Sequence, residues 1–264
     1  MKKRALIGLL AAVLCGLLAA PVMAQESETV YFRVSSWDVK RTHWATFVER
    51  FEKNTQPTLE RLFEEGVITE WGISSNSVHS KDGYTHSIWW VGKNLASLAR
   101  VFDEANEGVS PEERRKRSAE LAGAIHKHED LIGRSLIYKT RPTQTDEGYF
   151  FVTRHKILPG RGSAWRKNWE QYAQPTYDKL LENGTIYGYG IDRQRIHTDD
   201  PRYRSVWYSV PNLEAEGKVR AAFREAMQSR SEAEREALFA AWASFADRSK
   251  HRDSMHRLIH YAVK

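Results

Sequence analysis

The chain has 264 residues, 41% hydrophobic and 28% charged, with 40 Lys and Arg against 34 Asp and Glu. This length suffices for two small domains with cores of their own, and the single cysteine, Cys15, excludes a disulfide framework within the chain. Basic residues such as Arg114 and Arg115 stand among Glu112, Glu113 and other acids, which is typical of a solvated helix face rather than a nucleic-acid-binding surface.

The first 24 residues have the pattern of a secretory signal peptide. A basic start at 2–4 precedes an apolar stretch over 5–20, and small residues at Val22 and Ala24 form a cleavage site before Gln25. Two alternatives are a membrane anchor, for which the stretch is shorter than the roughly 20 residues needed, and a lipoprotein at Cys15, where Leu14 is too large. We therefore expect a periplasmic or secreted mature protein without a thiol, without membrane contact, and with 37 basic against 34 acidic residues, a net charge of +3.

The rest of the chain contains one segment twice. Residues 31–95 align without a gap on residues 149–213, and 19 of the 65 pairs are identical. The repeated unit is about the size of one small domain. We expect two domains of the same fold, at residues 28–141 and 148–264, joined by a short polar linker at 143–147.

Each repeat predicts the same order of elements. In the first, strands are expected at 29–37, 67–75, 84–91 and 135–140, with a helical region between the first and second strands and another between the third and fourth. Pro57 and Pro175 fall inside the first helical region of their repeats and should kink or split it, while Gly66 and Gly184 should end it. Capping boxes are expected at Ser110–Glu113 and Ser231–Glu234, and a final strand at 257–263.

The order β-α-β-β-α-β is the ferredoxin-like order, so the predicted class is α+β with two tandem repeats. Helices should cover one face of each sheet. The opposite faces carry aromatic residues that would be too apolar for water, and we expect the two sheets to face each other as one intrachain α+β barrel. Strand alternation places Arg33, Ser35 and Trp37 on one surface, and we expect this surface, with His155 of the second repeat, to face the space between the sheets. Phe32 and Val34 should then pack on the helices.

The segment Lys156-Ile157-Leu158-Pro159-Gly160-Arg161-Gly162, the helical region after it, and the residues at 180–189 carry a resemblance. They resemble the dimeric α+β-barrel superfamily, and in particular its antibiotic-biosynthesis-monooxygenase-like and NIPSNAP-like members. The superfamily includes monooxygenases, haem-binding enzymes, lactone isomerases and ligand-sensing domains, so the resemblance implies a fold more than a reaction. The first repeat has Arg41-Thr42 in place of the Pro-Gly pair.

Aromatic and polar residues that share strand faces give the candidate ligand site. An apolar wall with a few convergent polar groups is typical of a small-molecule pocket, although strand aromatics also belong to ordinary cores. The candidate ligand-binding residues are Arg33, Trp37, Trp89, His155, Tyr189 and Trp207.

The histidines do not predict a metal site. His79 and His197 are each followed three residues later by an aspartate, a pattern that fits a turn as well as a metal. His126 and His128 are expected near the end of a helix, where a cation favours the helix dipole. His251, His256 and His260 lie near the C-terminus, and His260 alternates with apolar residues that could turn it to the barrel interior. None of these sets has the spacing of a metal-binding helix motif.

The leading expectation is an exported soluble protein that binds a small aromatic or apolar molecule, either between sheet and helices or in the barrel. The alternative is a monooxygenase-like or haem-dependent oxidoreductase, for which His155 would be the informative residue, and a third reading is a structural or stress-related module without a ligand. No phosphate loop, nucleophile elbow or fixed pair of carboxylates occurs, so the sequence assigns neither a reaction nor a cofactor. The expected partner is a small molecule rather than nucleic acid, and both monomer and homodimer are compatible with the sequence.

Overall fold

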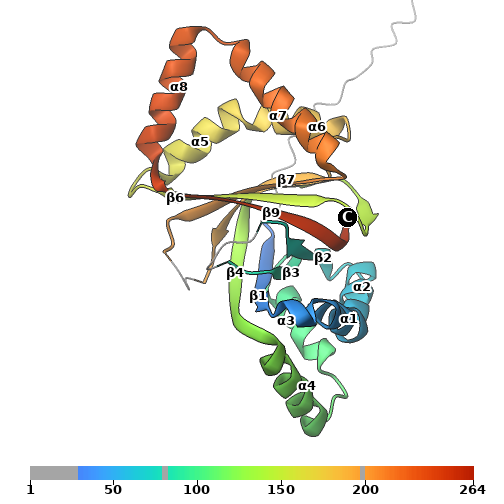
Figure 1. Ribbon diagram of the computed structural model, residues 1–264. Coiled ribbons are helices and arrows are strands. Elements are labelled where there is room, and N and C mark those ends of the chain that lie inside the picture. The colour runs from blue at the N-terminus through green and yellow to red at the C-terminus, as the bar shows by residue number, and fades with distance from the viewer. Residues whose placement is uncertain (1–28, 79–82, 197–199) are drawn as a thin grey trace, which may run out of the picture.

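The computed structural model describes residues 29–78, 83–196 and 200–264 (Figure 1). The predicted signal peptide and the predicted His79–Asp82 and His197 positions lie outside these residues. The first repeat consists of β1 (Tyr31–Val39), a short 3-10 turn (Arg41–His43), α1 (Trp44–Asn54), α2 (Gln56–Glu64), β2 (Ile68–Asn76), β3 (His86–Gly92), α3 (Leu95–Ala105), α4 (Pro111–Ala124) and β4 (Ile125–Thr140). The second consists of β6 (Tyr149–Ile157), α5 (Gly162–Tyr172), α6 (Gln174–Glu182), β7 (Gly188–Gln194), β8 (Tyr203–Val210), α7 (Leu213–Gln228), α8 (Glu232–Phe245) and β9 (Ala246–Val263).

Eight antiparallel strands close into a barrel within this chain. Their order is β2-β3-β1-β4-β7-β8-β6-β9, and β9 pairs back onto β2. The two repeats meet at two hydrogen-bonded seams, β4 with β7 and β9 with β2. A short strand in the linker, β5 (Thr143–Thr145), pairs with the end of β9. The predicted fold class, two ferredoxin-like repeats forming one α+β barrel, is confirmed.

Helices cover the barrel from two opposite sides (Figure 1). The helices α1 to α3 pack on the first repeat through residues such as Phe47, Leu59 and Leu98, while α5 to α7 pack on the second through Trp165, Tyr177 and other buried side chains. The helices α4 and α8 lead away from the sheets, and α4 has no buried residue. The molecule therefore has one core inside the barrel and one helix-facing core on each side.

Repeated prolines and glycines shape both repeats as predicted. The first helical region divides into α1 and α2 immediately before Pro57, and its counterpart divides into α5 and α6 before Pro175, because proline cannot donate the interior helical hydrogen bond. Gly66 and Gly184 follow these helices with φ of 76° and 77°, the left-handed conformation that closes a helix. The same backbone path is therefore built into both copies.

The helix caps of the two repeats differ slightly. Ser231 and Glu234 form the reciprocal capping box that we expected at the start of α8. At the start of α4, the Ser110 side chain accepts a hydrogen bond from the Glu113 backbone amide. Both serines thus satisfy a backbone donor that the first helical turn leaves free.

The last strand of each repeat is longer than the sequence pattern indicates. β4 begins at Ile125 rather than at 135, and β9 begins at Ala246 rather than at 257. His126 and His128 therefore lie on a strand, and the expectation that they end a helix is wrong. The early halves of both strands pair with β1 and β6, so pairing with a neighbour overrides the weak local preference for a strand.

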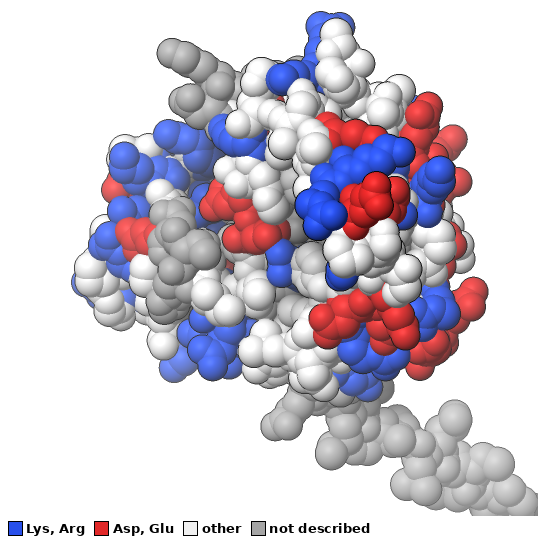
Figure 2. Space-filling view, turned by 90° about the horizontal axis from the view of Figure 1, so that it is seen from below, with Lys and Arg blue, Asp and Glu red and all other residues white. Residues whose placement is uncertain are grey.

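The surface of the chain is mixed in charge. Figure 2 shows Lys and Arg interspersed with Asp and Glu on the face viewed from below. Ion pairs join several of these side chains, such as Arg61 with Glu65 and Glu104. Among the described residues, no helix combines the length and the apolar character needed to cross a bilayer.

Candidate functional site

The six residues expected to form one ligand site lie on two different faces of the barrel wall. Trp89 and Trp207 point into the barrel, where Trp89 belongs to the interior cluster and Trp207 stacks on Phe150 at 5.3 Å between ring centroids. Arg33, Trp37, His155 and Tyr189 lie on the helix-facing side of their strands. No single pocket can hold all six.

The expected orientation of the first strands is therefore wrong. Phe32 points into the barrel, whereas Trp37 packs on Phe47 of α1 and His155 on Trp165 of α5. Alternation shows that Arg33, Ser35 and Trp37 share a face, but it does not reveal which face covers which core. Tryptophans occur in the interior core and in both helix-facing cores, so the orientation depends on how the closed barrel and the helices divide the large side chains between them.

Glycines make room for the tryptophans inside the barrel. A Cβ at Gly72 would lie 2.4 Å from the Trp89 ring, and a Cβ at Gly190 would lie 2.8 Å from the Trp207 ring. These are equivalent positions in the two repeats. The interior is thus a packed core built on repeated glycine–tryptophan pairs.

Two acidic side chains lie beside this interior core. Glu70, 2% exposed, accepts hydrogen bonds from Trp89 Nε1 at 2.8 Å and from the Tyr138 hydroxyl at 2.6 Å. Burial raises the pKa of Glu70 to about 7 even though both hydrogen bonds lower it. Loss of hydration likewise raises the pKa of Asp192 to about 7, and Ser135 donates a hydrogen bond to this carboxyl.

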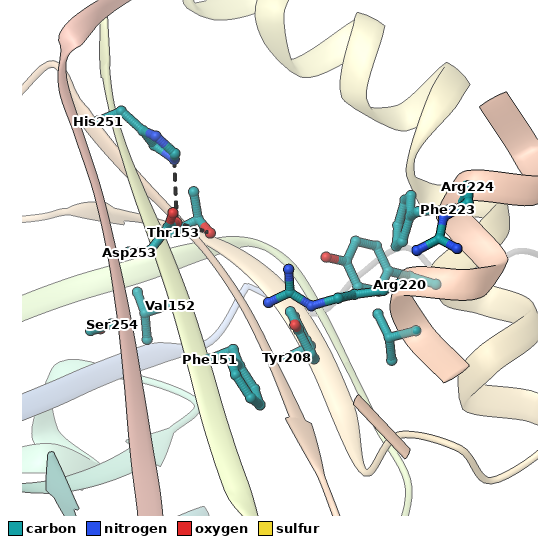
Figure 3. Close-up of a pocket in the computed structure, with 12 residues that line it drawn as sticks. Phe151, Val152, Thr153, Tyr208, Arg220, Phe223, Arg224, His251, Asp253 and Ser254 are labelled. Carbon is teal, nitrogen blue, oxygen red and sulfur yellow. Dashed lines mark hydrogen bonds and ion pairs between the residues drawn. The ribbon is translucent and has the colours of Figure 1, made fainter. Parts of the chain in front are cut away.

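A cavity of about 550 Å³ lies between the sheet and the helices of the second repeat (Figure 3). Its floor comes from β6, β8 and β9, and its opposite wall comes from α6 and α7. The lining residues are Phe151, Val152, Thr153, Tyr177, Tyr208, Val219, Arg220, Phe223, Arg224, His251, Asp253 and Ser254. This is the size and the mixture of surfaces that small-molecule sites have.

Aromatic rings form much of the cavity wall. Phe151 and Tyr208 lie nearly parallel, with ring centroids 5.0 Å apart and an interplanar angle of 9°. Across from them, Tyr177 contacts Phe223 edge to face at 4.8 Å. Burial raises the pKa of the Tyr177 and Tyr208 hydroxyls, so both remain protonated and neutral in the physiological range.

A row of polar side chains faces this wall from the strands. Thr153 donates a hydrogen bond to Asp253 at 2.7 Å, and His251 Nε2 lies 3.3 Å from the same carboxylate (Figure 3). Behind them, the His155 ring stacks on His251 at 5.1 Å. Burial and the neighbouring His251 lower the pKa of His155 to about 4, so His155 is neutral near pH 7.

Sequence reasoning singled out His155 but placed it on the barrel-facing side of its strand, and it missed the residues that line the cavity. Among them are His251 and Asp253, whose counterparts in the first repeat are His128 and Asp130, offset by 123 residues rather than 118. The repeated His-x-Asp pattern was the available signal. It falls beyond the segment that aligns without a gap, because the second helical region of the second repeat is three residues longer and an irregularity at the start of β9 adds two more.

Of the other histidines near the C-terminus, His260 has two carboxylate partners. His260 contacts Glu52 at 2.9 Å and Asp146 at 2.8 Å, and so lies on the outside of the barrel. The expectation that it could face the interior with Leu258 fails because a bulge in β9 shifts the alternation between these two residues. No group of three or more potential metal ligands occurs in the described part of the chain.

Comparisons with known proteins identify the fold. No protein-family model and no curated protein matches the sequence. Solved structures do match: a putative monooxygenase from Fusobacterium nucleatum has a TM-score of 0.64 at 10% identity, covering 89% of this chain and 95% of that one. A putative monooxygenase from Lactobacillus acidophilus has a TM-score of 0.55 at 11% identity (89% and 97% covered), and an anthrone oxidase-like protein has 0.53 at 9% (90% and 94%). These likenesses extend over nearly the whole of each structure, and the chain has the dimeric α+β-barrel fold that we expected from the resemblance.

Proposed function

We propose that this α+β-barrel chain is an exported protein that binds a small aromatic molecule between the sheet and the helices of its second repeat. The observation that carries the proposal is the cavity whose aromatic wall faces the polar row of Thr153, His251 and Asp253. An aromatic ring would pack against Phe151 and Phe223, and a hydroxyl on it would donate to Asp253.

The location supports binding rather than packing alone. The barrel interior is filled by large side chains and repeated glycine–tryptophan contacts, whereas the second repeat leaves open space beside neutral aromatic rings. Export is supported by the basic, apolar and small-residue segments at the N-terminus. The test for export is mass spectrometry of protein from the native host, which should give an N-terminus near Gln25; an intact Met1 on cytoplasmic material would contradict it.

The binding test uses 2-naphthol, a neutral aromatic probe with one hydroxyl. In amide NMR spectra of the full mature chain, saturable shifts should centre on β6, β8, β9 and α7. Phe223→Ala should weaken binding about tenfold, because one aromatic wall is lost. Phe239→Ala is the matched control, since Phe239 is an aromatic residue of α8 that is 56% exposed and does not line the cavity. Shifts confined to the barrel interior would contradict this location of the site, and the absence of saturable binding would favour a module without a ligand.

A monooxygenase-like activity on the same ligand is the second candidate, because His251 and Asp253 form a pair suited to proton transfer at the cavity wall. Two of the similar solved structures carry the name putative monooxygenase, and a third is anthrone oxidase-like. Among reactions of this class, oxidation of anthrone by O₂ to anthraquinone and water needs no reductant besides the substrate. His251 would remove the ring proton, and O₂ would accept the electrons and supply the new carbonyl oxygen. If the wild-type chain consumes oxygen in the presence of anthrone and His251→Ala does not, this candidate is supported. If the wild-type chain consumes no more oxygen than buffer alone, it is rejected.

A haem does not fit this cavity. His155, the residue expected to inform on haem chemistry, does not line it and stacks on another imidazole. His251 does line it, but its Nε2 faces Asp253 rather than open space.

A further inference from the structure

We propose that the molecule bound in the second repeat is an aromatic carboxylate, and that Arg220 receives its anionic group. This inference rests on the proposed function and narrows it to one class of ligand. Its basis is a comparison of the two repeats at equivalent positions.

An arginine and a phenylalanine exchange places between the repeats. In the first repeat the strand β1 carries Arg33 and the helix α3 carries Phe102. In the second, the same positions on β6 and α7, 118 residues later, carry Phe151 and Arg220. The positive charge has therefore moved from the sheet to the helix that faces it.

In the first repeat, the strand arginine is paired within the protein. The Arg33 guanidinium lies 3.8 Å from the centre of the Phe102 ring, and its Nη2 contacts Asp130 at 2.5 Å. Ser35 also donates to Asp130, and Trp37 stacks on His128 at 3.6 Å. An internal ion pair therefore occupies the region between β1 and α3 that corresponds to the cavity.

In the second repeat, the carboxylate that corresponds to Asp130 is Asp253, and the position of Arg33 on the neighbouring strand holds no arginine. Phe151 stands there instead, with its ring against Tyr208. Arg220 extends from α7 toward the strands from the opposite wall (Figure 3). Its side chain is 71% exposed, so the charge borders both the cavity and solvent.

The charges around Arg220 favour an anion over a cation. Glu216 engages Nε of Arg220, which leaves the edge formed by Nη1 and Nη2 as a second pair of donors, and Arg224 adds a second positive charge one turn along α7. Asp253 already accepts from Thr153 and lies beside His251. A ring seated between Phe151 and Phe223 would bring its substituent within reach of Arg220, and the paired donors of a guanidinium suit a carboxylate.

The test compares 2-naphthoate with 2-naphthol by isothermal titration calorimetry at pH 7, where the first is anionic and the second neutral. The wild-type chain should bind 2-naphthoate more tightly than 2-naphthol. Raising the salt concentration should weaken the binding of 2-naphthoate and leave the binding of 2-naphthol unchanged. Arg220→Gln should weaken the binding of 2-naphthoate about tenfold and should change the binding of 2-naphthol less than about twofold. Tenfold is at the low end of what loss of a charged hydrogen bond costs, because the site is exposed.

Lys218→Gln is the matched control. Lys218 is on the same helix, 63% exposed, and paired with a glutamate four residues earlier as Arg220 is, but it does not line the cavity. Equal binding of the two probes by wild type, or equal losses in both glutamine variants, would overturn the assignment to Arg220 while leaving aromatic binding intact. Failure of both probes to bind wild type would instead overturn the proposed function itself. Unchanged amide NMR spectra away from α7 check that Arg220→Gln is folded.

Discussion

The buried carboxyl of Glu70 makes the stability of the barrel depend on pH, and Glu70→Gln should remove much of this dependence. Glu70 is 2% exposed and accepts two hydrogen bonds, from Trp89 and Tyr138. Burial raises its pKa from 4.5 to about 7, because charge is unfavourable where water is excluded. Glutamine resembles the protonated acid in shape and hydrogen bonding but cannot ionise.

The direction and the size of this pH dependence follow from the pKa of Glu70 in the unfolded and in the folded chain. Between pH 4.5 and 7 the folded chain holds a proton on Glu70 that the unfolded chain has released, so the free energy of unfolding falls as pH rises. The difference between a pKa of 4.5 and one of about 7 corresponds to about 3 kcal/mol of unfolding free energy. This contribution to stability is fully present below pH 4.5 and is lost above pH 7. Asp192 should contribute in the same direction, since its pKa is also raised to about 7.

The assay is urea unfolding followed by tryptophan fluorescence at pH 5 and pH 8. The loss of unfolding free energy between these values should be about 2–3 kcal/mol smaller in Glu70→Gln than in wild type. Tyr138→Phe is the control: it removes a hydrogen bond that lowers the pKa of Glu70 but keeps the carboxyl, so the dependence on pH should persist or grow. Parallel pH profiles for wild type and Glu70→Gln would refute the reasoning.

Three further predictions concern packing, capping and titration. Gly72→Ala and Gly190→Ala should each lower the free energy of unfolding by about 1–3 kcal/mol in urea titrations, because a Cβ would overlap a tryptophan ring, and wild-type stability in either would contradict the packing described. Ser231→Ala should cost about 1 kcal/mol in the same assay through loss of the α8 cap, whereas Ser249→Ala on the exposed part of β9 should cost less. The His155 ring should titrate near pH 4 in NMR spectra, so it gains a proton only in acid; a midpoint near 6.5 would contradict its burial.

The fold could be predicted because the information is local and repeated. Pro57 and Pro175 interrupt the same helix in both copies, and Gly66 and Gly184 end it in the same conformation. The order of strands and helices around these residues permits few arrangements. Closure through two seams follows once both repeats present free strand edges.

The site could be predicted only in part, because strand alternation is symmetric between the two faces of a sheet. Phe32 and Trp37 both have large apolar rings, and only the volume of the closed barrel determines that Phe32 points inward. The polar half of the site lies on the early part of β9, where Asp253 stands in a charged stretch without a strand pattern. Arg220 belongs to a helix whose distance from the sheet no sequence pattern gives.

The barrel cannot close between β2 and β9 until β9 has been synthesised. β2 is complete by residue 76, but its partner on this side begins to pair only at residue 256, close to the end of the chain. Until then β2 presents an unpaired edge, the kind of edge that recruits strands from other molecules. A chain truncated at residue 245 should therefore show rapid amide exchange along β2 and a tendency to aggregate, whereas protected amides there would contradict this order. β9 is synthesised after the other strands of the barrel and closes it, so the first repeat keeps an exposed strand edge until β9 is made.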